Sequence, residues 1–245
     1  PENDTPSYSV VGATATDGSY TVTGSYGTLV LNASTGAYTY SLNNTATAVQ
    51  SLGGSSSVTE TFSVQVTDGA NTPAAQNLSF TIQGANDAPS GVTLSKTSVE
   101  ENSAGAIVGA LSASDAEDNS LSYSVASSGD GASFEIDNSN NLKLKSSVSA
   151  DRETVSSYTV TVDVSDGTDT TSQAFTISVG DVNEAPTLTV PTGGSVTEDA
   201  STSTITGSLT SADPENDTPS YSVVGATATD GSYTVTGSYG TLVLN

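Results

Sequence analysis

Apolar and small polar residues alternate with a period of two along most of the chain. The longest stripe comprises Tyr158, Val160, Val162 and Val164, with polar residues between them. Shorter stripes are Tyr38, Tyr40 and Leu42; Phe62, Val64 and Val66; Leu78, Phe80 and Ile82; Leu121, Tyr123 and Val125; and Phe175, Ile177 and Val179. This period is typical of β-strands that bury one face, because successive side chains point to opposite sides. The pattern predicts a chain built from short β-strands.

Turn signals separate these stripes. Asp-Gly pairs stand at residues 17–18, 68–69 and 166–167, and only residues 45–52 suggest a short helical turn. Hydrophobic residues make up 34% of the chain, which suits several thin-cored domains better than one large globule. We therefore predict an all-β fold of tandem Greek-key β-sandwich domains, joined end to end in an elongated rod.

A long internal repeat organises the chain. Residues 1–32 and 214–245 are identical, so the period is 214 − 1 = 213 residues. An identity of this length implies a recent duplication within a tandem array, because a shared fold alone tolerates sequence drift. We expect the chain to be one period plus an overlap, taken from a longer array.

Two Pro-terminated segments predict the domain boundaries. Residues 84–89 and 180–186 each follow an alternating stripe and end in Ala-Pro, which stops a strand ladder. We predict that residues 1–88 are the later part of a sandwich whose first strands are missing. Residues 89–186 are then a complete sandwich, and residues 187–245 begin the next copy of the first one.

Composition narrows the range of functions. Four basic residues face 27 acidic ones, giving a net charge of −23, so nucleic acid is a poor candidate partner. The chain has no Cys, Met, Trp or His, which removes disulfides, the usual zinc ligands and His-activated nucleophiles. No apolar run reaches the length of a membrane span. The acidic excess serves either solubility alone or the binding of hard cations.

Acidic residues gather beside the two predicted linkers. The clusters are Glu100 and Glu101; Asp115, Glu117 and Asp118; Asp151 and Glu153; Asp166; Asp181, Asn183 and Glu184; Glu198 and Asp199; and Asp213, Glu215, Asn216 and Asp217. Carboxylates packed this closely repel each other, and calcium relieves the repulsion by accepting six to eight oxygen ligands. No cluster has EF-hand spacing, so the ligands must converge from separate strands and loops. We interpret Asp17, Asp130, Asp137 and Asp169 as solvated turn residues.

Residues 90–186 resemble a bacterial cadherin-like domain. The matching motifs, in order, are Val99–Asn102, Asp115–Asp118, Ala150–Glu153, Val164–Asp166 and Asp181–Pro186. The sequence departs from the family pattern at Ala150, where the family has Leu, and at Glu184 and Ala185, where it has Asp and Asn. The resemblance implies an immunoglobulin-like, cadherin-like sandwich that binds calcium.

Residues 187–245, continued by residues 33–88, resemble the VCBS repeat. The motifs that carry this resemblance are Val196–Asp199, Gly27–Asn32, Tyr38–Asn43, Phe62–Gly69 and Gly84–Pro89. Alternating modules of these two kinds look like the extender region of a giant bacterial adhesin of the repeats-in-toxin (RTX) type. The resemblance implies type I secretion and an extracellular place on the bacterial surface.

The resemblance also implies two sets of calcium ligands. At the second junction they are Glu101 or Glu100, Asp151, Glu153, Asp181, Asn183, Glu184, Asp213 and Glu215. At the first junction they are Asn86, Asp87, Asp115, Glu117 and Asp166, whereas Gly84 replaces the linker Asp. We therefore expect about two or three calcium ions at the second junction and about one at the first.

The sequence leads to a functional hypothesis with two rivals. We expect a calcium-rigidified stalk segment of a secreted adhesin, which projects a ligand-binding tip for cell adhesion or biofilm formation. Its expected partners are neighbouring repeats of the same chain, and a second copy that completes its unfinished sandwiches head to tail, but neither nucleic acid nor membrane. One rival is a module that itself binds carbohydrate or protein. The other is an enzyme, for which paired carboxylates are the only support, and we predict that the chain is not one.

Overall fold

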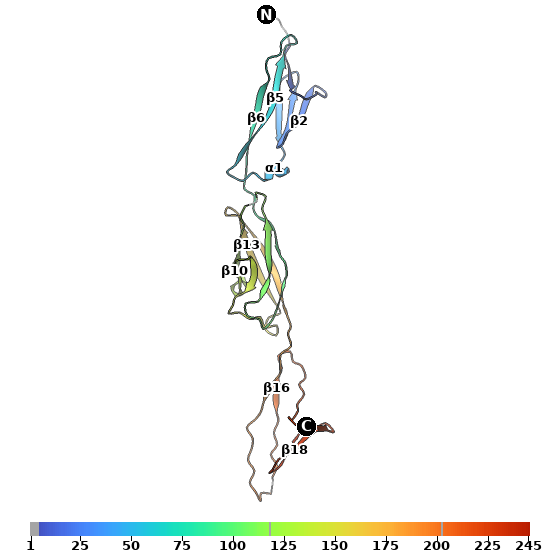
Figure 1. The fold of residues 1–245 in the computed structure, drawn as a ribbon, viewed down its shortest axis with the longest axis vertical. Helices are drawn as coiled ribbons and strands as arrows, with labels where there is room; N and C mark the ends of the chain where they lie inside the picture. Colours follow the sequence, from blue (N-terminus) through green and yellow to red (C-terminus); the bar gives the residue numbers. More distant parts are fainter. Residues whose placement is uncertain (1–4, 118, 202) are drawn as a thin grey trace. The chain divides into compact units, whose positions relative to one another are not determined.

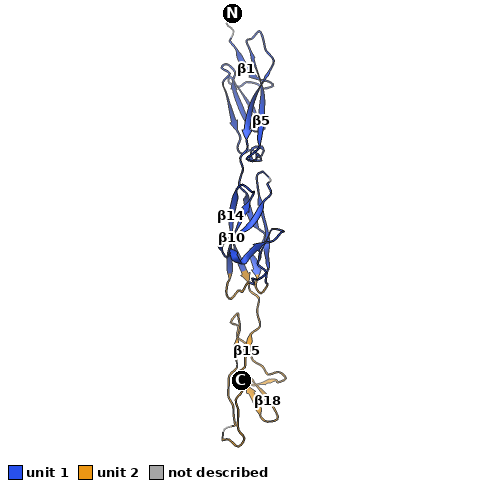
Figure 2. Ribbon diagram, turned by 90° about the vertical axis from the view of Figure 1, so that its left-hand side faces the viewer, with its two compact units in different colours: residues 1–99, 104–149, 157–178 blue, residues 100–103, 150–156, 179–245 orange. Residues whose placement is uncertain are grey.

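The computed structural model describes residues 5–117, 119–201 and 203–245, and nearly all of their regular structure is β-strand (Figure 1). Asp118 of the acidic motif lies outside the described residues. The chain divides into two compact units (Figure 2), of which unit 1 comprises residues up to 99, 104–149 and 157–178. Unit 2 comprises residues 100–103, 150–156 and 179–245. The all-β prediction is confirmed, whereas the boundaries of the three domains stay a prediction.

The first module of unit 1 contains two three-stranded antiparallel sheets. One sheet has the order β1 (Ser7–Val10), β5 (Ser57–Thr67) and β6 (Gln76–Gln83). The other has the order β2 (Ser19–Thr23), β3 (Gly27–Asn32) and β4 (Tyr38–Leu42). The expected helical turn is α1 (Thr47–Gln50), just before β5.

The alternating stripes of this module meet in one small core. Val10, Leu29, Leu31 and Phe62 are buried there, and partly buried aromatic rings pack around them. Glu60, also on β5, is a buried carboxylate that accepts hydrogen bonds from the Tyr40 hydroxyl at 2.7 Å and the backbone N–H of Tyr26 at 3.0 Å. Burial, together with this hydrogen bond and the Glu60 charge, raises the pKa of Tyr40 to about 12. Glu60 is therefore a satisfied structural carboxylate.

The second module is a sandwich of two four-stranded sheets. One sheet has the order β10 (Ser122–Gly129), β13 (Ser157–Ser165), β14 (Thr170–Gly180) and β8 (Ser98–Glu100). The other has the order β11 (Phe134–Ile136), β12 (Asn141–Leu144), β9 (Ile107–Ser114) and β7 (Ser90–Leu94), with a 3-10 turn at Gly131–Ser133 before β11. Non-consecutive strands are neighbours in both sheets, as in a Greek key.

The predicted stripe on β13 forms the centre of the second module. Val160, Val162 and Val164 are fully buried, and Phe134 of the facing sheet is buried with them. Burying such side chains contributes roughly 1.5–3 kcal/mol each. The nine-residue register of β13 with β14, from Ser157↔Ser178 to Ser165↔Thr170, holds this stripe toward the core.

Unit 2 carries the last five strands in two small sheets. β15 (Thr187–Thr189) pairs with β16 (Thr210–Ala212). β17 (Ala228–Thr229), β18 (Ser232–Thr236) and β19 (Thr241–Leu244) form the other sheet. The β18–β19 hairpin repeats the register of β2–β3, since Tyr233 pairs with Leu244 as Tyr20 pairs with Leu31. No helix among the described residues is long and apolar enough to cross a membrane.

Candidate metal centres

The predicted ligands gather in two acidic clusters. We call residues 86, 87, 115, 117 and 166, all in unit 1, the first junction. We call residues 101, 151, 153, 181, 184 and 215, all in unit 2, the second junction. Each is assembled from a Pro-terminated segment and from loops distant in sequence, as the absence of EF-hand spacing predicted.

At the first junction, Asn86 and Asp87 are held by carboxylates of the second module. The Asn86 side-chain amide donates to Asp166 Oδ2 at 2.9 Å and to Asp169 Oδ2 at 2.8 Å. The Asp87 backbone N–H donates to Glu117 Oε1 at 3.1 Å. Hydrogen bonds from Asn86 and from the backbone N–H groups of Asp169 and Thr168 lower the pKa of Asp166. This part of the cluster is therefore stable in its charged form.

Two carboxylate oxygens at the first junction are buried without a hydrogen-bond partner. They are Asp115 Oδ2 and Glu117 Oε2. Desolvation, opposed by the Asp87 N–H and supported by the charges of Asp115 and Asp87, raises the pKa of Glu117. Burying an anionic oxygen without a hydrogen-bond donor costs free energy. No described protein atom donates to these two oxygens, so a positive partner from outside the protein would stabilise them.

Gly84 explains why this junction has fewer acids. A Cβ at Gly84 would lie 2.2 Å from the Leu52 carbonyl oxygen and 2.3 Å from that of Gly53. The segment after α1 thus occupies the space of an acidic side chain at this position. The sequence difference noted at Gly84 has a steric cause in the first module.

At the second junction, Glu101 is the anchoring residue. It is only 2% exposed, and its carboxylate accepts the backbone N–H groups of Arg152 at 2.6 Å and Val182 at 2.7 Å. Glu100, the alternative considered from the sequence, is exposed and lies beside Gly180 instead. Of the two neighbouring acids, Glu101 is the one that the backbone holds inside the cluster.

Five carboxylates of the second junction form two overlapping triads. Ligand oxygens of Glu101, Asp151 and Glu153 lie within 4.8 Å of one another, and so do those of Glu153, Asp181 and Glu215. Glu153 belongs to both triads. A hydrogen bond from its own backbone N–H lowers its pKa, but desolvation and the charges of Glu101, Glu215 and Asp181 outweigh this, so that the pKa is raised. Among the described residues, no such triad lies at the first junction.

Glu184 and Glu215 add a coupled pair to the second junction. The Glu184 backbone N–H donates to Glu215 Oε1 at 3.1 Å, and the Asn102 side-chain amide donates to Glu184 Oε1. Glu184 Oε2 and Glu215 Oε2 are buried without a partner. The contact with Glu215, together with desolvation, raises the pKa of Glu184 to about 7, and the same contact lowers the pKa of Glu215. Repulsion between two adjacent carboxylates opposes the ionisation of both, which is why the two pKa values move apart.

Two predicted ligands take other places. Asn183 is exposed, and its amide donates to the backbone carbonyl of Glu184 at 3.0 Å. Asp213 accepts the Asp217 N–H at 3.0 Å through Oδ1 and caps the turn that presents Glu215. Neither residue belongs to a triad.

Sequence reasoning missed two participants. Asp169, which we interpreted as a solvated turn residue, accepts a hydrogen bond from Asn86, and Asn102 donates to Glu184. Asn102 lies in the matched Val99–Asn102 motif, so its position in the chain was a usable signal. Nothing in the sequence distinguished Asp169 from other turn acids.

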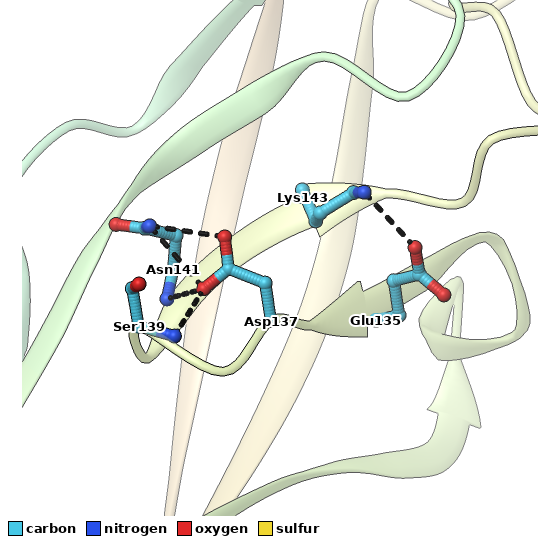
Figure 3. A network of polar contacts seen from close by, with 5 residues as sticks. All are labelled: Glu135, Asp137, Ser139, Asn141 and Lys143. Carbon is cyan, nitrogen blue, oxygen red and sulfur yellow. Dashed lines mark hydrogen bonds and ion pairs between the residues drawn. The ribbon is translucent and has the colours of Figure 1, made fainter.

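Asp137 shows what a self-sufficient carboxylate looks like (Figure 3). Its Oδ1 accepts the backbone N–H groups of Ser139 and Asn141, each at 2.9 Å, and the Asn141 amide donates to Oδ2 at 3.0 Å. These hydrogen bonds, with Asn141 first, lower its pKa. Nearby, Lys143 pairs with Glu135 at 3.2 Å. The protein satisfies these acids, whereas it leaves oxygens at both junctions without partners.

The second module is a cadherin-like β-sandwich. A family model of the cadherin domain matches residues 95–180, which span β8 to β14 of the second module. No curated protein matches the sequence. Human CDH23 EC21-23 is a structural neighbour with a TM-score of 0.52 and 19% identity, covering 86% of this chain and 69% of that one.

Two further neighbours have lower scores. Mouse Cadherin-23 EC22-24 has a TM-score of 0.49 and 18% identity, covering 86% of this chain and 65% of that one. The Protocadherin GammaB4 extracellular domain also has a TM-score of 0.49 and 18% identity over 86% of this chain. The match spans only 32% of the length of that protocadherin. At these identities the likeness concerns the fold.

Proposed function

We propose that the chain is a calcium-rigidified stalk segment of a secreted bacterial surface adhesin. The observation that carries the proposal is the set of four buried carboxylate oxygens without partners, two at each junction. The chain has only four basic residues, so ion pairs cannot neutralise its 27 acids. Calcium supplies the positive charge and accepts oxygen ligands in flexible geometry, which fits sites that contain carboxylates and amide oxygens.

Different residues would supply the calcium ligands at the two junctions. Glu101, Asp151, Glu153, Asp181 and Glu215 offer carboxylate oxygens within reach of one another at the second junction. Glu184 adds a further oxygen after losing its proton. At the first junction, Asp115 and Glu117 offer their unpartnered oxygens beside Asp87. We therefore propose more calcium at the second junction than at the first.

The mechanical consequence follows from the placement of these acids. In each cluster, a Pro-terminated segment is tied to loops from other parts of the chain. Without a cation the carboxylates repel each other and loosen the segment. Extracellular calcium sites of this kind have dissociation constants of about 10⁻⁴ to 10⁻³ M, so they fill outside the cell. The proposed stalk stays loose before secretion and stiffens afterwards.

The partners that we propose are neighbouring repeats of the same chain. This agrees with the 213-residue period (214 − 1) and with the cadherin-like second module, a domain class typical of extracellular adhesion proteins. The VCBS assignment of the flanking segments, their secretion by a type I system and a role in biofilm formation belong to the same proposal. An enzymatic function has no support beyond the paired acids, which cation binding already explains.

The test is calorimetric calcium titration of the whole chain, combined with small-angle scattering in calcium and in excess chelator. We expect several bound ions and a longer, less flexible particle in calcium. Magnesium serves as the control cation, because it demands a tighter octahedral site and retains water. An indifferent scattering curve with no measurable calcium binding would refute the stalk function.

A further inference from the structure

Triplets of the form Asn-x-Ser or Asn-x-Thr recur along the chain. The side-chain amide of such an asparagine accepts N-linked sugars in secreted proteins when the middle residue is not proline. The complete triplets within the described residues begin at Asn32, Asn43, Asn77 and Asn216. A triplet this short also arises by chance in a chain rich in Ser and Thr, so the surroundings of each amide decide whether it can react.

The triplet at Asn77 lies within a regular strand. Asn77 is on β6, opposite Ser63 of β5, and the Ser79 hydroxyl shares a hydrogen bond of 3.0 Å with the Thr61 hydroxyl. Residues two apart in a strand stand about 7 Å from each other, so the hydroxyl does not reach the amide. The strand ladder and the contact of Ser79 hold this triplet in a form unsuited to sugar transfer.

The triplets at Asn32 and Asn216 are engaged in other ways. Asn32 is partly buried in the turn between β3 and β4, and its Oδ1 accepts the backbone N–H groups of Ser34 at 3.0 Å and Thr35 at 2.9 Å. Asn216 directly follows Glu215 of the second junction and has a left-handed backbone, with a φ of 60°. One amide is thus sheltered by its turn, and the other lies beside an acidic cluster.

Among the described triplets, the one at Asn43 joins its amide to its hydroxyl. Asn43 and Thr45 are both exposed, in the turn that follows β4. The Thr45 hydroxyl donates to Asn43 Oδ1 at 2.8 Å, and the Thr45 backbone N–H donates to the same oxygen at 3.2 Å. Donors on Oδ1 draw electron density away from Nδ2 and make its N–H bonds more acidic. Within the described chain no hydrogen bond engages that nitrogen, so it is free to react.

The exposure of this turn does not come from the edge position of β4. In the second module, β12 is the strand that corresponds to β4, and it has neighbours on both sides. The turn after β12 is nevertheless open, since Ser146 and Ser147 are exposed. A turn at this place in the sandwich therefore stays accessible, whether its strand has one neighbour or two.

We propose that Asn43 is an acceptor site for N-linked glycosylation, with a nucleotide-activated sugar as donor and a separate glycosyltransferase as catalyst. In this step Asn43 Nδ2 forms a bond to C1 of the sugar, and the bond between C1 and the phosphate oxygen breaks. The nucleoside diphosphate leaves with the electron pair, and a base of the transferase takes the proton from Nδ2. The sugar adds a bulky polar group to the surface and leaves the core unchanged. The proposal does not rest on the calcium sites.

The test uses the purified full chain, UDP-glucose and a soluble asparagine glycosyltransferase. Mass spectrometry of the intact chain detects added hexose, and peptide mapping locates it. Asn43→Gln removes the acceptor, and Thr45→Ala removes the hydroxyl. The matched controls are Asn44→Gln, which changes the neighbouring amide but keeps the triplet, and Thr45→Ser, which keeps the hydroxyl. All three positions are exposed, and circular dichroism checks that each variant keeps its fold.

The folded chain should carry hexose on Asn43, lose it in Asn43→Gln and Thr45→Ala, and retain it in both controls. Chain digested to peptides before the reaction is the positive control for the enzyme, because every triplet is then unfolded, and it should also accept sugar at Asn32, Asn77 and Asn216. A folded chain that takes no sugar, an Asn43→Gln variant that takes as much as the unmodified chain, or equal modification of Asn43 and Asn77 would each overturn the proposal.

Discussion

At the scale of single residues, the same side-chain chemistry has two outcomes in this chain. Asp137 is satisfied by N–H groups of its own turn, whereas Glu117 and Glu184 retain buried oxygens without a donor. The pKa values move accordingly: that of Asp137 is lowered and those of Glu117 and Glu184 are raised. An acid with enough local donors is stable in its charged form, whereas one without them is stabilised by a proton or by the cation that we propose.

Glu153 is the residue whose loss should affect calcium binding most, because it belongs to both triads. We predict that Glu153→Gln weakens binding at the second junction by roughly tenfold or more, or about 1.4 kcal/mol. Calorimetric titration measures the change. Glu135→Gln is the control, since Glu135 contacts Lys143 away from both junctions. Equal affinity of the two variants would contradict the shared-ligand role.

Asp137 should make the second module sensitive to acid. Its folded-state pKa is lowered below the ordinary 3.8, so its stabilising contribution is present above that value and is lost as the pH falls through the folded pKa. We predict that Asp137→Asn reduces the free energy of unfolding at neutral pH. The difference from the unmodified chain should shrink in acid, as the pH falls from the ordinary pKa of 3.8 toward the lowered folded-state pKa, because the unfolded chain takes up the proton first. Urea unfolding at neutral and at acid pH measures this, and a constant difference would count against it.

At the scale of elements, corresponding strands differ in what covers them. β12 lies inside a four-stranded sheet, whereas β4 is at the edge of a three-stranded one. Their alternating patterns look alike in the sequence, but only β12 has both neighbours. The contribution of an apolar residue to stability therefore depends on whether neighbouring strands bury it, and the alternating pattern alone does not determine this.

A matched pair of substitutions measures this difference. Leu142→Ala removes a fully buried side chain, so it should cost about 2–5 kcal/mol of stability. Tyr38→Ala removes an exposed ring that meets Phe80 edge to face at 5.8 Å, so it should cost about 1 kcal/mol or less. Urea unfolding in dilute solution, followed by circular dichroism, gives both values. A larger loss of stability for Tyr38→Ala than for Leu142→Ala would contradict this difference in burial.

At the scale of the whole molecule, the charge of −23 should set the response to salt. We predict that the radius of gyration in chelator falls as sodium chloride is added, because the salt screens repulsion between carboxylates. With calcium bound, the same salt should have a smaller effect. Small-angle scattering in the four conditions provides the measurement. If sodium chloride changed the radius of gyration equally with and without calcium, the prediction that bound calcium reduces the repulsion would be wrong.

Much of the candidate site was predictable because its residues lie in short motifs beside the linkers. Glu101, Asp151, Glu153, Asp181 and Glu215 were all named from the sequence and lie together. The choice of Glu101 over Glu100 was not predictable, since it depends on which carboxylate meets the N–H groups of Arg152 and Val182. The contact of Asp169 with Asn86 joins residues far apart in the chain, so no local sequence pattern could predict it.

The duplicated segment separates what sequence determined from what tertiary structure decided. Both copies form the same hairpin with the same register, and Asp17 and Asp230, in the turn just before it, have the same φ of 51°. The first copy also forms β1, which pairs with β5, whereas the identical residues 220–223 form no strand. A hairpin closes through its own turn, so its sequence suffices. A strand whose partner is distant, like a carboxylate whose donor is distant, depends on what the rest of the fold brings to it.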